Sequence, residues 1–208
     1  NVAWGVALKV NDLGGKVVTI SGPDGYIYDE EGISGEKIDF MVEMRGRGDN
    51  RVEAYLEKYP NAVFHKGKSV WEVKVDVAIP CATQNELHED DAKKLIANGV
   101  ICVTEAANMP STLGAIKEFL NAKVLFAPGK AANAGGVAAS GLEMTQNSIR
   151  LNWTSEEVDT RLKEIMVGIH NQCKKYGADG EGYVNYVKGA NIAGFVKVAD
   201  AMLAQGVV

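Results

Sequence analysis

Short runs of β-branched residues alternate along the chain with longer stretches whose apolar residues recur at helical spacing. Strands are predicted by apolar runs at residues 16–20, 63–64, 73–79, 100–104 and 124–127. Helices are predicted between them, at residues 1–13, 35–59 with an interruption near 46–50, 86–98 and 112–119. Strands that alternate with helices favour βαβ units, and βαβ units build a parallel sheet.

The remainder of the chain has a purely helical pattern. Thr154 and Glu157 have the spacing of a capping box, in which each side chain binds the other residue's backbone N–H. The apolar residues behind them lie on one helix face: Val158, Leu162, Ile165, Met166 and Ile169. A last helix is predicted around residues 192–203. The pattern therefore predicts an α/β protein with a helical C-terminal segment.

The composition is that of an ordinary globular protein. The 208 residues are 46% hydrophobic and 24% charged, which suits one large domain or two small ones. The net charge of −5 leaves no basic surplus, so we expect no nucleic-acid partner. No apolar run approaches the ~18–20 residues of a membrane span, and the first residues do not resemble a signal peptide, so we expect no membrane association.

Cysteines and histidines point to no metal or disulfide chemistry. The three cysteines, Cys81, Cys102 and Cys173, are odd in number and far apart, which fits buried thiols in a reducing, cytoplasmic protein. The three histidines are isolated and match no zinc motif. The sequence also contains no GxSxG elbow and no Walker A loop. We therefore expect no metal site.

Segments rich in small and polar residues follow the predicted strands, where ligands bind in an open parallel sheet. They are residues 21–25, 80–85, 105–110 and 128–141, and residues 1–5 are of similar composition. Asp24 is placed either to bind an adenosine ribose or to form an ordinary turn. Thr83 and Asn108 are suited either to ribose hydroxyls or to helix capping.

Residues 128–141 are the most unusual of these segments. So many small residues make a poor core and a costly helix, but they allow a ligand to lie against the backbone. We expect Asn133 and Ser140 to be the polar groups that point into the resulting cleft.

Taken together, these segments resemble the cofactor-binding half of the hexameric glutamate dehydrogenase family. The matching stretches, which run over essentially the whole chain, are NVAWG, SGPDGYIYD, PCATQNEL, EAANMPST, APGKAANAGGVAASGLEMTQN and YVKGANIAGFVKVADAMLAQGV. The resemblance implies a doubly wound, mainly parallel Rossmann-like sheet with helices on both faces. It implies a dinucleotide-binding domain over residues 1–185 and a C-terminal helix over 186–208 that returns toward the hinge. Because the chain opens on a predicted helix, we expect the first strand of the sheet to be missing from this fragment.

The resemblance also implies where NAD or NADP binds. In the family a G-x-G precedes Asn-Val-Ala, so Ala3 matches the last small residue of a G-x-G-x-x-A motif, beside which the pyrophosphate rests. Arg45 matches a position where some members carry a basic residue near the 2′-phosphate of NADP. The residues implied to contact the cofactor are Asn1, Val2, Asp24, Arg45, Ala82, Thr83, Asn108 and Asn133.

For the substrate, Ser140 resembles the family serine that binds the γ-carboxylate of glutamate, and Val137 lines the same pocket. The reaction implied is the reversible NAD(P)-dependent oxidative deamination of L-glutamate to 2-oxoglutarate and ammonia, catalysed by a homohexamer. The family's catalytic lysines and aspartate belong to a substrate domain outside this chain. We therefore assign no catalytic residue, leave Lys130 without a role, and expect the chain alone to be inactive.

Two other interpretations remain open at this point. A branched-chain or phenylalanine dehydrogenase of the same superfamily needs an apolar side-chain pocket, and the hydroxyl of Ser140 favours a carboxylate substrate instead. A stand-alone nucleotide-binding or regulatory module without catalysis is also consistent with the sequence. The residues that precede this chain would separate these alternatives.

Overall fold

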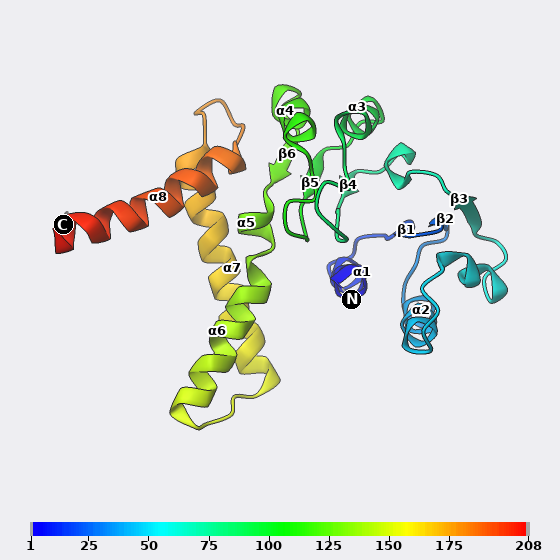
Figure 1. Ribbon diagram of the computed structural model, residues 1–208, viewed down its shortest axis with the longest axis horizontal. Coiled ribbons are helices and arrows are strands. Elements are labelled where there is room, and N and C mark those ends of the chain that lie inside the picture. The colour runs from blue at the N-terminus through cyan, green and yellow to red at the C-terminus, as the bar shows by residue number, and fades with distance from the viewer. Residues whose placement is uncertain (1, 207–208) are drawn as a thin grey trace. The chain divides into compact units, whose positions relative to one another are not determined.

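The computed structural model describes residues 2–206, and the chain divides into two compact units, residues 1–73 and 74–208. Figure 1 shows their elements, which are described here one unit at a time. The first unit contains α1 (Val2–Asp12), β1 (Thr19–Gly22), β2 (Gly25–Tyr28), α2 (Glu36–Gly46), the 3₁₀ helix η1 (Val52–Glu57), β3 (Val63–Lys66) and the 3₁₀ helix η2 (Val70–Glu72).

The sheet of the first unit is antiparallel, with strand order β1-β2-β3. This corrects the expectation of a strand at residues 16–20 followed by a turn at 21–25. The strand begins at Thr19, and a two-residue turn of Pro23 and Asp24 reverses the chain directly into β2. Gly25 has φ of +147°, and a Cβ there would overlap the His65 carbonyl oxygen on β3, so only glycine fits.

The core of this unit lies between the sheet, α1, α2 and η1. Its buried members are Ala7, Ile20, Ile27, Ile33, Ile38, Met41, Val52, Tyr55 and Ala62. The predicted helix at 35–59 is interrupted as expected, because α2 ends at Gly46 and a separate 3₁₀ helix follows.

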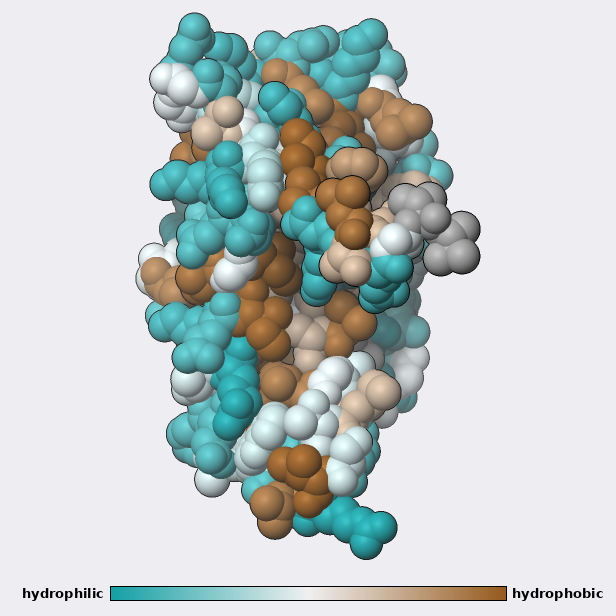
Figure 2. Space-filling model, turned by 90° about the vertical axis from the view of Figure 1, so that its left-hand side faces the viewer, coloured by the Kyte–Doolittle hydropathy of each residue, from teal (hydrophilic) through white to brown (hydrophobic). Residues whose placement is uncertain are grey.

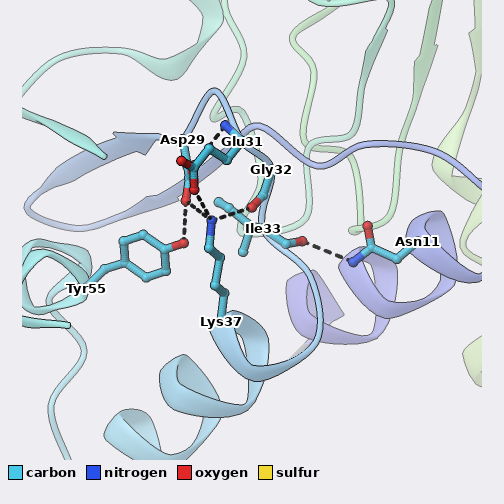
Figure 3. Close-up of polar contacts among 7 residues, drawn as sticks. All are labelled: Asn11, Asp29, Glu31, Gly32, Ile33, Lys37 and Tyr55. Carbon is cyan, nitrogen blue, oxygen red and sulfur yellow. Dashed lines mark hydrogen bonds and ion pairs between the residues drawn. The ribbon is translucent and has the colours of Figure 1, made fainter. Parts of the chain in front are cut away.

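A buried polar network connects the elements of the first unit (Figure 3). The Asp29 carboxylate, 3% exposed, accepts hydrogen bonds from Lys37 Nζ at 2.8 Å and from the Tyr55 hydroxyl at 2.6 Å. Lys37 also donates to the Gly32 carbonyl at 2.9 Å, and Asn11 Nδ2 donates to the Ile33 carbonyl at 3.0 Å. These hydrogen bonds connect the segment between β2 and α2 to α1, α2 and η1.

The charges of this network shift the pKa of each partner. Burial alone would raise the pKa of Asp29, but the hydrogen bonds from Lys37 and Tyr55 outweigh it, and the pKa is lowered. For Lys37, burial would lower the pKa, but the contact with Asp29 raises it. Burial and the neighbouring carboxylate raise the pKa of Tyr55, so its hydroxyl is a hydrogen-bond donor.

The second unit has the alternation of strands and helices that the sequence predicts. Its elements are β4 (Val77–Ala78), α3 (Glu89–Ala97), β5 (Cys102–Thr104), α4 (Leu113–Asn121), β6 (Leu125–Ala127), α5 (Gly129–Ala132), α6 (Ala134–Ile149), α7 (Ser155–Gly177) and α8 (Tyr186–Gln205). The strands form a parallel sheet in the order β4-β5-β6. The strand predicted at 73–79 is reduced to two paired residues. This α/β arrangement is Rossmann-like.

Residues 128–141 are largely helical, although their glycines carry a cost in a helix. They form α5 and the first half of α6, with Asn133 between the two helices. Alanine is the strongest helix former, and the alanines of this segment offset the cost of its glycines.

The C-terminal helices follow their sequence signals. Thr154 caps α7 in the predicted capping box, because its side chain accepts from Glu157 N–H while Glu157 accepts from Thr154 N–H. Helices α7 and α8 then cross at close range. A Cβ at Gly189 would overlap the Cys173 carbonyl oxygen, and one at Gly177 would overlap the Asn185 carbonyl oxygen.

Large hydrophobic side chains are exposed on α6, α7, α8 and the segment after α6. They are Val137, Met144, Ile149, Leu151, Ile165, Val167, Phe195, Val198, Met202 and Leu203. Figure 2, seen from the side of the C-terminal end of α8, shows hydrophobic side chains gathered in an interrupted band between hydrophilic flanks. Among the residues described, no helix combines the length and the apolarity needed to cross a bilayer.

Candidate functional site

The loops that follow β4, β5 and β6 meet at one edge of the parallel sheet, as the carboxyl ends of parallel strands must. Ala106 N–H donates to the Pro80 carbonyl at 2.9 Å, and Asn85 N–H donates to the Met109 carbonyl at 3.0 Å. Both Asn85 and Met109 have positive φ, of 56° and 53°. The two predicted loops are thus bonded to each other along their length.

Ala82 and Thr83 lie exposed in the first of these loops. Ala82 N–H donates to Glu86 Oε1 at 2.8 Å, so Glu86 folds the loop back on itself. Burial raises the pKa of Glu86 despite its bonds to the Ala82 and Thr83 amides. Burial, together with Glu86, raises the pKa of the Cys81 thiol to about 11, which leaves it protonated and without nucleophilic character near neutral pH.

An open pocket of about 380 Å³ lies beside the loop after β5 and the helices after β6. Its walls are formed by Asn108, Gly129, Lys130, Asn133, Ala134, Gly136 and Val137. Asn133 Nδ2 donates to Asn108 Oδ1 at 3.0 Å, although the two residues are 25 positions apart in sequence. The structure therefore brings together three predicted site residues: Asn108, Asn133 and Val137.

Ser140 lies on α6 one turn beyond Val137 and is exposed to solvent. Residues three and four apart share a helix face, so Ser140 continues the face of α6 that begins at Asn133 and Val137. Its hydroxyl is not among the groups that form the walls of the pocket. Ser140 lies next to the pocket, at the far end of the helix face that Asn133 and Val137 begin.

Lys130 is a pocket residue to which the sequence assigned no role. Its Nζ donates to Asn191 Oδ1 on α8 at 2.6 Å, so the ammonium is held by a neutral amide. The signal that could have revealed Lys130 is its position three residues before Asn133, on the same side of the helical segment.

The other candidates belong to the first unit. Asp24 Oδ1 accepts from Val52 N–H at 3.1 Å, and Asp24 Oδ2 accepts from Glu53 N–H at 3.1 Å. Arg45 is exposed in the last turn of α2, and Val2, the first residue of α1, is 49% exposed. Asn1 lies outside the described residues.

Comparison with known proteins identifies the family. The family model described as "Glutamate/Leucine/Phenylalanine/Valine dehydrogenase" matches residues 1–206. The chain belongs to this dehydrogenase family. An NAD-specific glutamate dehydrogenase from Bacteroides fragilis is 61% identical over the whole chain, which covers 47% of that relative. An NADP-specific glutamate dehydrogenase from Haemophilus influenzae is 56% identical over the whole chain, which covers 46% of it.

Solved dehydrogenase structures have the same fold. A glutamate dehydrogenase of 50% identity superposes with a TM-score of 0.93 over 99% of this chain and 46% of its own. The Plasmodium falciparum enzyme, at 41% identity, has a TM-score of 0.93 over 99% of this chain and 44% of its own. The dehydrogenase chain described here thus spans about half the length of the relatives that it matches.

No cluster of three or more metal-binding side chains occurs in the part of this dehydrogenase chain that the structure describes. The groups available at the pocket are the amides of Asn108 and Asn133, the ammonium of Lys130 and the apolar side chain of Val137. The two amides can donate and accept hydrogen bonds, the ammonium can donate them, and the valine side chain offers an apolar surface. None of them is an activated nucleophile.

Proposed function

We propose that the whole protein catalyses the reversible NAD(P)-dependent oxidative deamination of L-glutamate to 2-oxoglutarate and ammonia, and that this chain supplies its cofactor-binding half. The observation that supports this most directly is the pocket in which Asn133 bonds Asn108 and from which α6 leads to Ser140. Family membership and the names of the relatives support the same reaction.

The pocket suits the nicotinamide and ribose end of a dinucleotide. A Cβ at Gly129 would lie 2.7 Å from the Ala107 carbonyl oxygen, so the pocket wall is built from a close backbone approach with no side chain in between. Asn108 and Asn133 offer amide donors and acceptors of the kind that bind ribose hydroxyls and a carboxamide. The nicotinamide, when bound, supplies the acceptor for the hydride that leaves the amino-acid Cα.

We further propose that Ser140 and Val137 form one wall of the substrate pocket. The Ser140 hydroxyl donates to the γ-carboxylate, and Val137 packs against the substrate's methylene groups. On the family resemblance alone, we also propose cofactor contacts for Ala82 and Thr83 in the second unit, and for Asp24, Arg45, Val2 and Asn1 in the first. Substrate orientation by these groups lowers the entropic part of the barrier, while the catalytic proton transfers belong to residues outside this chain.

The hydroxyl at position 140 favours glutamate over branched-chain amino acids or phenylalanine, because an apolar side chain would leave that hydroxyl without a partner. Cofactor choice is a separate proposal. The SGPDG turn resembles NAD-using members, so we propose a preference for NAD with appreciable use of NADP. Relatives above 50% identity carry both names, NAD-specific and NADP-specific.

We also propose that the protein is a cytoplasmic homohexamer with residues 1–185 as its dinucleotide-binding domain and 186–208 as a helix directed to the hinge. A glutamate dehydrogenase from Thermus thermophilus, which is similar at 22% identity and a TM-score of 0.80, is described as hetero-hexameric. The exposed hydrophobic side chains of α6, α7 and α8 support burial of this surface in a larger assembly.

The test is glutamate-dependent reduction of NAD and NADP, measured with the whole protein and with this 208-residue chain. We expect turnover by the whole protein and none by the chain alone. Leucine and phenylalanine serve as the competing substrates. Turnover of those amino acids at equal or higher kcat/KM would contradict the proposed specificity, and absence of any turnover by the whole protein would favour a binding or regulatory module.

A further inference from the structure

Glu105 lies directly behind the pocket, at the end of β5, and its side chain is buried with 4% exposure. Its Oε2 accepts a hydrogen bond from Gly129 N–H at 2.6 Å, and its Oε1 accepts one from Ser111 N–H at 3.1 Å. Its own N–H donates to the Ala127 carbonyl at 3.0 Å. One residue therefore connects β5, β6, the start of α5 and the loop before α4.

Burying a carboxylate is costly unless its oxygens are well bonded. Among the ion pairs of residues 2–206, none includes Glu105, so backbone amides are what hold it. An apolar side chain here would leave the buried Gly129 and Ser111 N–H groups without acceptors. The carboxylate therefore fixes the positions of these two amides, and Gly129 is itself a wall of the pocket.

The two segments that Glu105 holds are those that carry the pocket amides. Asn108 lies in the loop between Glu105 and Ser111, and Asn133 lies one helical turn beyond Gly129. A Cβ at Gly129 would lie 3.2 Å from Glu105 Oε2 as well as close to the Ala107 carbonyl, so the two segments are packed without slack. The 3.0 Å bond between Asn133 and Asn108 depends on this spacing.

We propose that Glu105 is a positioning residue for the dinucleotide: its buried carboxylate fixes the loop of Asn108 and the helix of Asn133 in the geometry that binds the nicotinamide end. This inference rests on the proposed function. Ligand-binding groups must be held within about 0.5 Å of their productive positions, and groups behind them provide that constraint. Loss of either bond to Glu105 lets the two segments move apart.

The test uses Glu105→Gln in the whole protein. Glutamine keeps the shape, but its amide nitrogen cannot accept from a backbone N–H, so one of the two bonds is lost. We expect kcat/KM for the dinucleotide to fall on the order of 10- to 100-fold, mainly through a rise in KM. A loss of folded molecules alone would lower kcat and leave KM unchanged, which separates positioning from stability.

Two further variants complete the comparison. Glu105→Asp keeps both acceptor oxygens, and we expect it to recover part of the lost dinucleotide binding. Glu164→Gln removes the same charge from an exposed position on α7 and should leave KM unchanged. Glu105→Gln with a KM for dinucleotide within twofold of wild type overturns the proposal.

Hydrogen exchange of the wild-type protein provides a test that needs no variant to fold. Within peptides covering residues 105–112 and 126–134, the Ser111 and Gly129 amides, which donate to Glu105, should both exchange slowly in the absence of ligand, and rapid exchange of either amide overturns the proposal. Failure of the proposed function has a different signature. In that case the wild-type protein reduces neither NAD nor NADP with glutamate, whatever the exchange rates of these peptides.

Discussion

The carboxylate of Asp24 holds the backbone of Val52. Asp24 Oδ1 accepts from Val52 N–H and Asp24 Oδ2 accepts from Glu53 N–H, each at 3.1 Å, so the side chain caps the 3₁₀ helix η1 from the hairpin turn between β1 and β2. A carboxylate offers about four lone-pair sites, so each oxygen retains capacity for a second donor. The Asp24 carboxylate can therefore cap η1 and still accept a hydrogen bond from a ribose hydroxyl of the proposed cofactor.

The capping role predicts a loss of stability in Asp24→Asn. The amide nitrogen cannot accept a hydrogen bond, so one backbone N–H of η1 loses its partner, at a cost of about 1 kcal/mol in the free energy of unfolding. Urea unfolding measures this directly. Asp200→Asn is the matched control, because Asp200 is exposed on α8. Equal stability of the two variants would show that the cap contributes nothing.

Cofactor choice gives a second prediction for the same residue. Asp24→Ser should raise the ratio of NADP to NAD efficiency by ~1–2 kcal/mol, because it removes a negative charge that repels the 2′-phosphate. Arg45→Ala should lower that ratio, since Arg45 is the exposed basic residue of the last turn of α2. The measurement is kcat/KM for both cofactors with the whole protein. A constant ratio in both variants would assign cofactor choice to other residues.

Substrate choice is tested at Ser140. In the whole protein, Ser140→Val should lower kcat/KM for glutamate by about 1–3 kcal/mol of transition-state binding, the usual cost when a polar group, here the carboxylate of the bound substrate, loses its hydrogen-bond partner. Selection against apolar amino acids should weaken at the same time, while dinucleotide affinity should change little. Ser148→Val on the same helix provides the control, because Ser148 lies two turns further along. Unchanged glutamate kinetics would remove Ser140 from the pocket.

The Asp29 network predicts how stability depends on pH. An aspartate whose folded-state pKa is lowered contributes stability above its unfolded-state pKa of about 3.9, and this contribution is lost as the pH falls through the folded value. Asp29→Asn should therefore cost on the order of 2 kcal/mol at pH 7, and the difference from wild type should shrink below about pH 4.

Urea unfolding from pH 2 to pH 7 checks this prediction, with Glu30→Gln as the control at an exposed neighbouring position. The raised pKa of Lys37 affects the free energy of unfolding at high pH. Its contribution is present below about pH 10.4 and is lost as the pH rises through its folded-state value. A difference between wild type and Asp29→Asn that stays constant with pH would exclude the ion pair as its source.

Two glycines on α8 give a matched pair of stability predictions. A Cβ at Gly189 overlaps the Cys173 carbonyl, so Gly189→Ala should destabilise the protein by at least about 1–3 kcal/mol. At Gly194 nothing lies within 4 Å of the place that a Cβ would occupy, so Gly194→Ala in the isolated chain should stabilise it by about 0.5–1 kcal/mol. Thermal unfolding measures both, and equal effects would contradict the packing described for α7 and α8.

Local signals predicted the elements that depend on local contacts. The capping box at Thr154 forms because both of its bonds join residues three positions apart. Strand β2 escaped prediction because Gly25–Tyr28 is short and follows directly on a turn, and its pairing with β3 depends on residues about 40 positions away. The strand predicted at 73–79 is shorter because a strand extends only as far as its partner offers backbone groups to pair with.

The same distinction applies to the site. Asn108 and Asn133 were predicted from small-residue segments after strands, and Val137 was implied by the family resemblance. The parallel topology brings the three to one pocket. Glu105 was not predicted, because its role depends on Gly129 and Ser111, which no spacing rule relates to it. Lys130 was not predicted either, although its spacing from Asn133 was an available signal, because its partner Asn191 lies on a distant helix. A charged residue directly after a strand, within a segment of small residues, was the available signal for Glu105.

The close crossing of α7 and α8 lies near the start of α8, so most of this helix extends beyond it. Backbone lies directly on backbone at Gly189, so α7 holds α8 closely at this point. About 16 residues of α8 extend beyond the crossing, which at 1.5 Å per residue is an arm of roughly 24 Å. Lys130 binds α8 at Asn191, two residues beyond the crossing at Gly189. A tilt of a few degrees beside the pocket therefore becomes an ångström-scale displacement at the far end of the helix.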